Sequence, residues 1–207
     1  MEFLKNQYRQ SIAFLRGPLY SDLHNTTIAF FVIWLLCFVV CLFCPSVLEM
    51  LMNYIQGVVD SSNIVGEDGS FSALRILGNN LRASGLSILY GIIPFLYLPA
   101  LTIGINAAVL GALTASYMVG GRSMLLLAAG LVPHGIFEIP ALLIAFACGL
   151  YLCRGMGALI RGKPESPQLG ELFLSLLRVY CTIMLPLLVA ASLIEAYIRP
   201  ACMAFFM

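Results

Sequence analysis

Long stretches without a charged side chain restrict most strongly how this chain folds. The first follows Thr27, reads IAFFVIWLLCFVVCLFC and ends before Pro45. An apolar run of roughly this length forms a helix that crosses the hydrocarbon core of a bilayer, which is about 30 Å thick. Only 10% of the 207 residues are Asp, Glu, Lys or Arg, whereas soluble domains carry about 25%. We therefore predict an all-α integral membrane protein whose first partner is the lipid bilayer.

The later apolar runs predict a bundle of about five transmembrane helices. Residues 81–118 are uncharged apart from Arg82, and Pro94 and Pro99 near the middle divide this stretch into two helices. Residues 123–132 would form only about 15 Å of helix before Pro133, so we expect a half-helix or a broken helix there. The predicted spans are 27–47, 80–98, 99–119, the half-helix 123–132 with 134–154, and 172–198.

The residues before the first span have a different pattern. Apolar side chains recur at helical spacing between Phe3 and Leu15, with Lys5, Arg9 and Arg16 on the rest of the surface. This pattern predicts an amphipathic helix at the membrane interface or against a partner protein. The expected organisation is thus an N-terminal segment, 1–26, followed by a single transmembrane domain, 27–207.

The positions of Lys and Arg predict the orientation. With five crossings, seven of the 11 basic residues, Lys163 among them, fall on the side of the N-terminus. Cytoplasmic loops carry the excess of Lys and Arg. The second loop, 46–70, agrees, because it has four acidic residues and no basic one. We expect a multi-pass protein of the cell membrane, with the N-terminus in the cytoplasm and the C-terminus outside. The net charge of +1 argues against nucleic acid as a partner.

A few polar side chains lie inside the predicted spans. His134 and Glu138 are four residues apart and share one face of a helix. In the five-span arrangement Glu195 reaches the same level of the bilayer. Charge inside a bilayer is costly, so such residues are functional candidates that need partners. The expected intramembrane polar cluster comprises His134, Glu138, Glu195, Arg82, Asn79, Asn80 and Asn106.

Three roles of this cluster stay open at the level of sequence. Arg82 would fix helix packing as an ion pair with Glu138 or Glu195. A proton or cation would bind at His134, Glu138 and Glu195, as in transporters. The same three side chains would also supply the three protein ligands of a zinc ion, although their spacing is not that of the H-E-x-x-H motif.

Several strings in the second half of the chain resemble one family. They are NNLRASGLSILYGI, GINAAVLGALTASY, LVPHGIFEIPALLIAFACGLYL and IEAYIRP, in this order, within about residues 75–200. Together they resemble the bacterial and archaeal membrane-protein family named after stage II sporulation protein M, and P-H-G-x-x-E-x-P is the most specific element. The resemblance implies an all-helical membrane protein of about five spans, with the family's polar positions at the seven residues of the cluster.

The resemblance also implies a function. The family's namesake works with two peptidoglycan-degrading partners as their membrane anchor, so our first hypothesis is a non-enzymatic scaffold or complex subunit. It would form a homodimer, another homo-oligomer or a heteromeric membrane complex. The stripe of small residues from Gly104 through Ala108 and Ala112 to Ala115 supports close helix packing. The alternatives are a permease subunit or small transporter and, second, an intramembrane zinc hydrolase.

Overall fold

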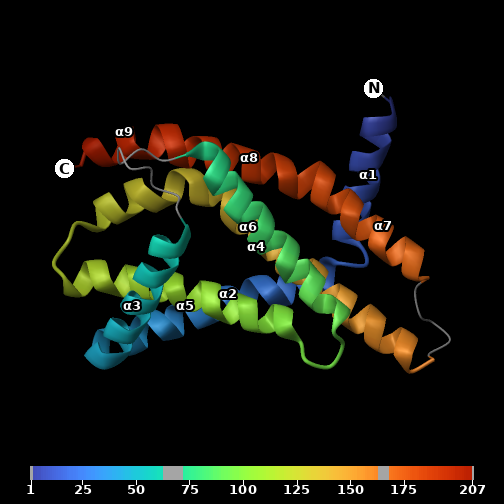
Figure 1. Cartoon of the computed structure of the whole chain (residues 1–207), viewed down its shortest axis with the longest axis horizontal. Helices are drawn as coiled ribbons and strands as arrows, with labels where there is room; N and C mark the ends of the chain where they lie inside the picture. Colours follow the sequence, from blue (N-terminus) through green and yellow to red (C-terminus); the bar gives the residue numbers. More distant parts are fainter. Residues whose placement is uncertain (1, 63–71, 163–167, 207) are drawn as a thin grey trace.

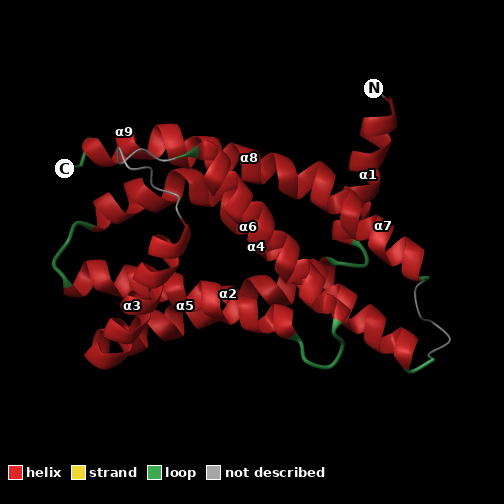
Figure 2. Ribbon diagram, in the orientation of Figure 1, coloured by secondary structure: helices red, strands yellow, loops and turns green. Residues whose placement is uncertain are grey.

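The computed structural model describes residues 2–62, 72–162 and 168–206, and every element within these ranges is a helix. Figure 2 shows these helices as a bundle with short connections. Among the described residues, four helices are long and apolar enough to cross a membrane, so the predicted all-α membrane bundle is confirmed. Lys163 and two of the four acidic residues of the second loop, Glu67 and Asp68, lie outside the described residues.

The N-terminal part forms two helices rather than one segment up to residue 26. Helix α1 covers Glu2–Arg16, and α2 covers Tyr20–Phe43, so the first apolar helix begins before the predicted residue 27. Helix α2 ends at Phe43 because Pro45 disfavours helical conformation in Cys44, the residue before it. Cys44 accordingly has φ −124° and ψ 86°, and the next residue opens α3, Pro45–Ser62.

The predicted second span, 80–98, is wrong in its limits. Helix α4 covers Ala73–Leu89, begins at a Ser72 cap and continues into a short 3-10 turn, Tyr90–Ile92. The chain comes very close to α6 at this turn, because a Cβ atom added at Gly91 would lie 2.2 Å from the carbonyl oxygen of Gly149. The predicted helix 80–98 extends too far because the apolar run continues through the turn into the next helix.

Helix α5, Leu98–Val119, packs along α2. The predicted small-residue stripe is confirmed at Ala112 and Ala115, which are buried against α2. The two backbones come very close at Gly111, where an added Cβ atom would be 2.7 Å from the carbonyl oxygen of Trp34. Gly104 has no such neighbour within 4 Å, so the predicted contact does not extend to that end of the stripe.

The predicted half-helix 123–132 and the break at Pro133 are wrong. Helix α6 is one helix, Met124–Ile160, that contains Pro133 and Pro140. A proline removes one backbone donor and crowds the preceding turn. In a membrane bundle neighbouring helices compensate for this loss, whereas lipid would leave the groups of a broken backbone unsatisfied. Figure 1 shows α6 bending rather than breaking, with α2, α4, α5 and α8 packed around it.

The last span is longer than the predicted 172–198, because the chain is helical over Leu169–Ala204. It consists of α7 (Leu169–Val179), α8 (Leu185–Leu193) and α9 (Arg199–Ala204), joined by π-helical turns at Tyr180–Met184 and Ile194–Ile198. Each π turn comes just before a proline, Pro186 or Pro200. The wider turn relieves the clash between a proline ring and the carbonyl four residues earlier.

Four of the five expected crossings correspond to helices of spanning length, and the helix at the place of the remaining one, α4, is shorter. Among the described residues the four are α2, α5, α6 and the helix Leu169–Ala204. Helix α4 has 17 residues and carries Arg75 and Arg82, which makes it less apolar than the others. Figure 1 places α1 and α9 at opposite ends of the long axis of the bundle.

Candidate functional site

The candidate site begins with two side chains on α6. His134 and Glu138 lie on consecutive turns of this helix, and Nε2 of His134 is 3.8 Å from Oε2 of Glu138. The side chain of His134 is 7% exposed and that of Glu138 is 23% exposed. The helical conformation of residues 134–138 sets this geometry, because a helix puts residues i and i+4 on one face.

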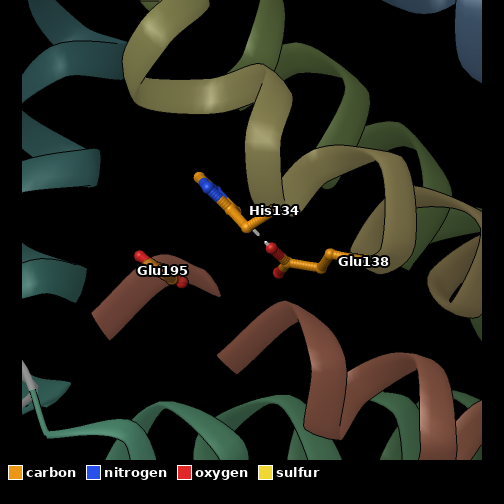
Figure 3. Close-up of side chains that lie close together, drawn as sticks. All are labelled: His134, Glu138 and Glu195. Carbon is orange, nitrogen blue, oxygen red and sulfur yellow. Dashed lines mark ion pairs between the residues drawn. The ribbon is translucent and has the colours of Figure 1, made fainter. Parts of the chain in front are cut away.

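The third side chain comes from the C-terminal helix. Glu195 lies in the π turn Ile194–Ile198, and Figure 3 shows its carboxylate across from His134 and Glu138. One ligand atom from each of these three residues lies within 4.8 Å of the other two. Nη1 of Arg199 donates a hydrogen bond of 2.9 Å to Oε1 of Glu195. We call His134, Glu138 and Glu195 the site triad.

The site triad lines a cavity of about 450 Å³ between the helices. Helix α3 closes one side of it with apolar side chains, and α4 and α5 contribute three amides. Its lining residues are Tyr54, Ile55, Val58, Val59, Ile76, Asn79, Asn80, Ile105, Asn106, Val109, His134, Glu138 and Glu195. A smaller cavity of about 160 Å³ between α2, α5 and α6 shares Asn106, Val109, His134 and Glu138 with it. His134 and Glu138 therefore line both cavities.

Two buried polar atoms beside this cavity have no hydrogen-bond partner among the described residues. They are Nδ1 of His134 and Nδ2 of Asn80. His134 is 6% exposed and Asn80 is 7% exposed, so bulk water does not solvate them freely. An unsatisfied polar group in such a place costs about 1–3 kcal/mol. A bound ligand, ion or water in the cavity would remove this cost.

The charges at the site favour a positively charged occupant. Glu138 and Glu195 have carboxylate oxygens within 4.8 Å of each other. Two full negative charges at such a separation repel by roughly 3 kcal/mol at an effective dielectric constant of about 20. Arg199 offsets one of them. A cation between the carboxylates would convert the remaining repulsion into attraction.

The structure brings together most, but not all, of the predicted cluster. His134, Glu138 and Glu195 converge, and Asn79, Asn80 and Asn106 line the same cavity. Arg82 is an exposed residue of α4 outside this lining, so the predicted ion pair of Arg82 with Glu138 or Glu195 is wrong. Arg199 takes that role because it lies one turn after Glu195. The i, i+4 spacing of Glu195 and Arg199 was the signal that sequence reasoning missed.

A second ion pair, also missed, lies toward the other end of α6. Arg154 of α6 binds the carboxylate of Asp22 on α2, and the guanidinium also lies 6.0 Å from the centre of the Tyr151 ring. Asp22 is buried, whereas the side chain of Arg154 is 50% exposed. The position of Asp22, just before the first apolar run, was the available signal. The ion pair of Asp22 and Arg154 connects α2 with α6.

Comparison with known proteins shows the family of the chain. Residues 26–200 match the family described as Stage II sporulation protein M. The chain belongs to the stage II sporulation protein M family. The match includes all three residues of the site triad. An uncharacterized protein from Methanocaldococcus jannaschii is 32% identical over 130 residues, which cover 63% of this chain and 72% of that protein. No solved structure matches the chain.

Proposed function

We propose that this protein is a permease subunit or small membrane transporter that binds a cation at the site triad. The observation that carries the proposal is the convergence of His134, Glu138 and Glu195, from two helices of membrane-spanning length, on one cavity. Ionisable groups inside spanning helices face cavities and mark ion pathways in membrane proteins. Transporters place such sites between helices near the middle of the bilayer.

Hydrolysis is less well supported by the same cavity. A zinc hydrolase needs three protein ligands and also a group that accepts a proton from the metal-bound water. Using the site triad as ligands commits both carboxylates. Apart from Tyr54, the remaining polar side chains in the described lining are the amides of Asn79, Asn80 and Asn106. Amides bind and orient a ligand but do not act as general bases.

Transport is tested in vesicles that contain the purified protein. We expect the wild-type chain to carry at least one cation from a panel of Na⁺, K⁺, Mg²⁺, Mn²⁺ and Zn²⁺, followed with indicators trapped inside. Glu138→Gln should abolish this flux, whereas Glu171→Gln, an exposed residue at the start of α7, should retain it. Absence of a flux difference between wild type and Glu138→Gln for every cation would overturn the proposal.

The same proposal includes an orientation and an assembly. The Lys and Arg distribution favours a cytoplasmic N-terminus, and α4 as a fifth crossing would put the C-terminus outside. Four helices of spanning length in one chain are few for a transporter, so a homo-oligomer or a second membrane subunit would complete the pathway. Reporter fusions at each terminus test the orientation, and reporters on the same side would contradict it.

A scaffold is the second candidate, and the position of α1 favours it. One side of this helix is held by the C-terminal helix. Arg178 Nε donates to Gln7 Oε1 at 2.7 Å, and the hydroxyls of Thr182 and Ser11 are hydrogen-bonded at 2.8 Å. The other side exposes Phe3, Leu4 and Tyr8. A photo-crosslinker at Tyr8 in native membranes should capture a protein partner if this candidate is right, and lipid alone would contradict it.

A further inference from the structure

We infer that the cation bound by the site triad is a divalent transition metal of the zinc class. The inference rests on the cation site of the proposed function and adds the chemical class of the ion. It is argued from the donor atoms, the geometry of the ligands, the unsatisfied polar atoms and the charge balance of the cavity.

The donor atoms select against hard cations. The site triad offers one imidazole nitrogen and carboxylate oxygens. Ca²⁺ takes six to eight oxygen ligands, and Mg²⁺ prefers octahedral oxygen coordination with several waters retained. Imidazole instead suits zinc, copper, iron and nickel. A buried histidine between two carboxylates is therefore a mixed N and O site of the kind that zinc occupies in proteins.

The number and spacing of the ligands fit four-coordinate binding. Zinc bonds of about 2.0–2.2 Å in a tetrahedron place neighbouring ligand atoms about 3.3 Å apart. His134 Nε2 and Glu138 Oε2 are already 3.8 Å apart, and the triad atoms all lie within 4.8 Å. Small rotations of the two flexible glutamate side chains close the difference. Three protein ligands leave a fourth position, which opens to the cavity.

The unsatisfied atoms are the independent observation that points to a ligand. His134 and Asn80 are both more than nine-tenths buried and line the cavity, and Nδ1 of His134 and Nδ2 of Asn80 have no partner among the described residues. With Nε2 bound to the metal, the ring proton lies on Nδ1, which would donate it to a water or ligand in the cavity. A water or hydroxide in the fourth position provides an acceptor for the Asn80 amide. Asn80 is thus assigned as a positioning residue for the fourth ligand.

The charge balance completes the argument. Glu138 and Glu195 bring two carboxyl groups to the site, and the Arg199 guanidinium pairs with the carboxylate of Glu195. A divalent cation bound to both carboxylates leaves, together with Arg199, one net positive charge, which a bound hydroxide or an anionic ligand neutralises. Buried charges are tolerated when they are paired or coordinate a metal. The site thus accommodates a divalent ion together with one negatively charged ligand.

Equilibrium binding of Co²⁺ to the full chain in mild detergent tests the inference. Co²⁺ serves as the probe because four-coordinate Co²⁺ absorbs visible light far more strongly than octahedral Co²⁺. We expect about one Co²⁺ per chain with the intense spectrum, displaced by equimolar Zn²⁺ and retained in excess Mg²⁺ or Ca²⁺. His134→Asn, Glu138→Gln and Glu195→Gln should each weaken binding by at least about 100-fold, since even changes to residues that only hydrogen-bond to a metal ligand cost about 10–100-fold.

Matched controls separate the site from other surface groups. His24→Asn and Glu171→Gln change the same residue types at exposed positions and should leave binding unchanged. Absence of stoichiometric binding, displacement by Mg²⁺ or Ca²⁺, or equal binding by the triad variants would overturn the inference. The assay needs no flux, so its failure is distinguishable from that of transport: Glu138-dependent flux of Na⁺ or K⁺ without Co²⁺ binding would overturn only the metal class.

Discussion

Glu195 and Arg199 are joined by a hydrogen bond of 2.9 Å across a π turn, and this bond holds the carboxylate opposite α6. One turn of one helix thereby supplies both a positively charged guanidinium and a negatively charged carboxylate to the site. The turn exists because Pro200 follows it. A regular α-helical turn would rotate Glu195 relative to α6, so the proline indirectly positions a residue of the site triad.

This pairing predicts a metal-dependent stability of Arg199→Gln. Without the Arg199 guanidinium, no positively charged group offsets the carboxylates of Glu138 and Glu195. The free energy of unfolding should therefore fall by about 1–3 kcal/mol when metal is chelated. Added Zn²⁺ should restore more stability to Arg199→Gln than to wild type, measured by thermal unfolding in detergent. The charge-matched double variant Glu195→Gln/Arg199→Gln should lose this response, and an equal response in all three chains would refute the pairing argument.

The Asp22–Arg154 pair predicts an asymmetry. Arg154→Gln leaves the buried Asp22 carboxylate without its partner, whereas Asp22→Asn leaves a guanidinium that is half exposed and reaches water. Arg154→Gln should therefore destabilise the chain more, by about 1–3 kcal/mol against 1 kcal/mol or less. Unfolding curves of both variants and of the double variant check this. A larger loss for Asp22→Asn would contradict the burial argument.

The close contact between α4 and α6 predicts different results for two Gly→Ala substitutions. A Cβ atom at Gly149 would lie 2.4 Å from the carbonyl oxygen of Ser87, whereas one at Gly104 meets nothing within 4 Å. Gly149→Ala should cost about 1–3 kcal/mol through overpacking. Gly104→Ala should be neutral or slightly stabilising, because alanine favours helix. Similar melting temperatures for the two variants would rule out the close approach.

The amides in the cavity predict a second contrast. Nδ2 of Asn106 already donates to the Thr102 carbonyl at 2.8 Å, whereas Nδ2 of Asn80 has no partner among the described residues. Asn80→Ala should weaken Co²⁺ binding by about 10-fold and alter its visible spectrum, because the fourth ligand loses a donor. Asn106→Ala should leave both properties near those of wild type. A larger effect of Asn106→Ala than of Asn80→Ala on Co²⁺ binding would contradict the role assigned to Asn80.

Much of the fold could be predicted from the sequence because lipid imposes simple rules. The uncharged run after Thr27 and the small residues Ala112 and Ala115 predicted a spanning helix and its packing face correctly. The error at Pro133 came from reading proline as a break. That reading suits soluble helices, but in α6 neighbouring helices support the turn.

The site could be predicted in part. The spacing of His134 and Glu138 and the level of Glu195 were enough to bring the triad together. Arg82 was misassigned because sequence gives the depth of a residue along a helix but not the direction in which it points. Arg199 and the unsatisfied amide of Asn80 depend on a π turn and on a cavity between helices far apart in the sequence, and neither has a signature in local sequence.

Anomalous X-ray diffraction from crystals grown with Zn²⁺ tests the central claim most directly. Data collected on either side of the zinc absorption edge locate the ion without reference to activity. The account predicts a peak in contact with His134, Glu138 and Glu195, with a fourth ligand on the side of Asn80. A zinc peak only elsewhere on the chain, or none at the triad, would contradict the claim that these side chains form a metal site.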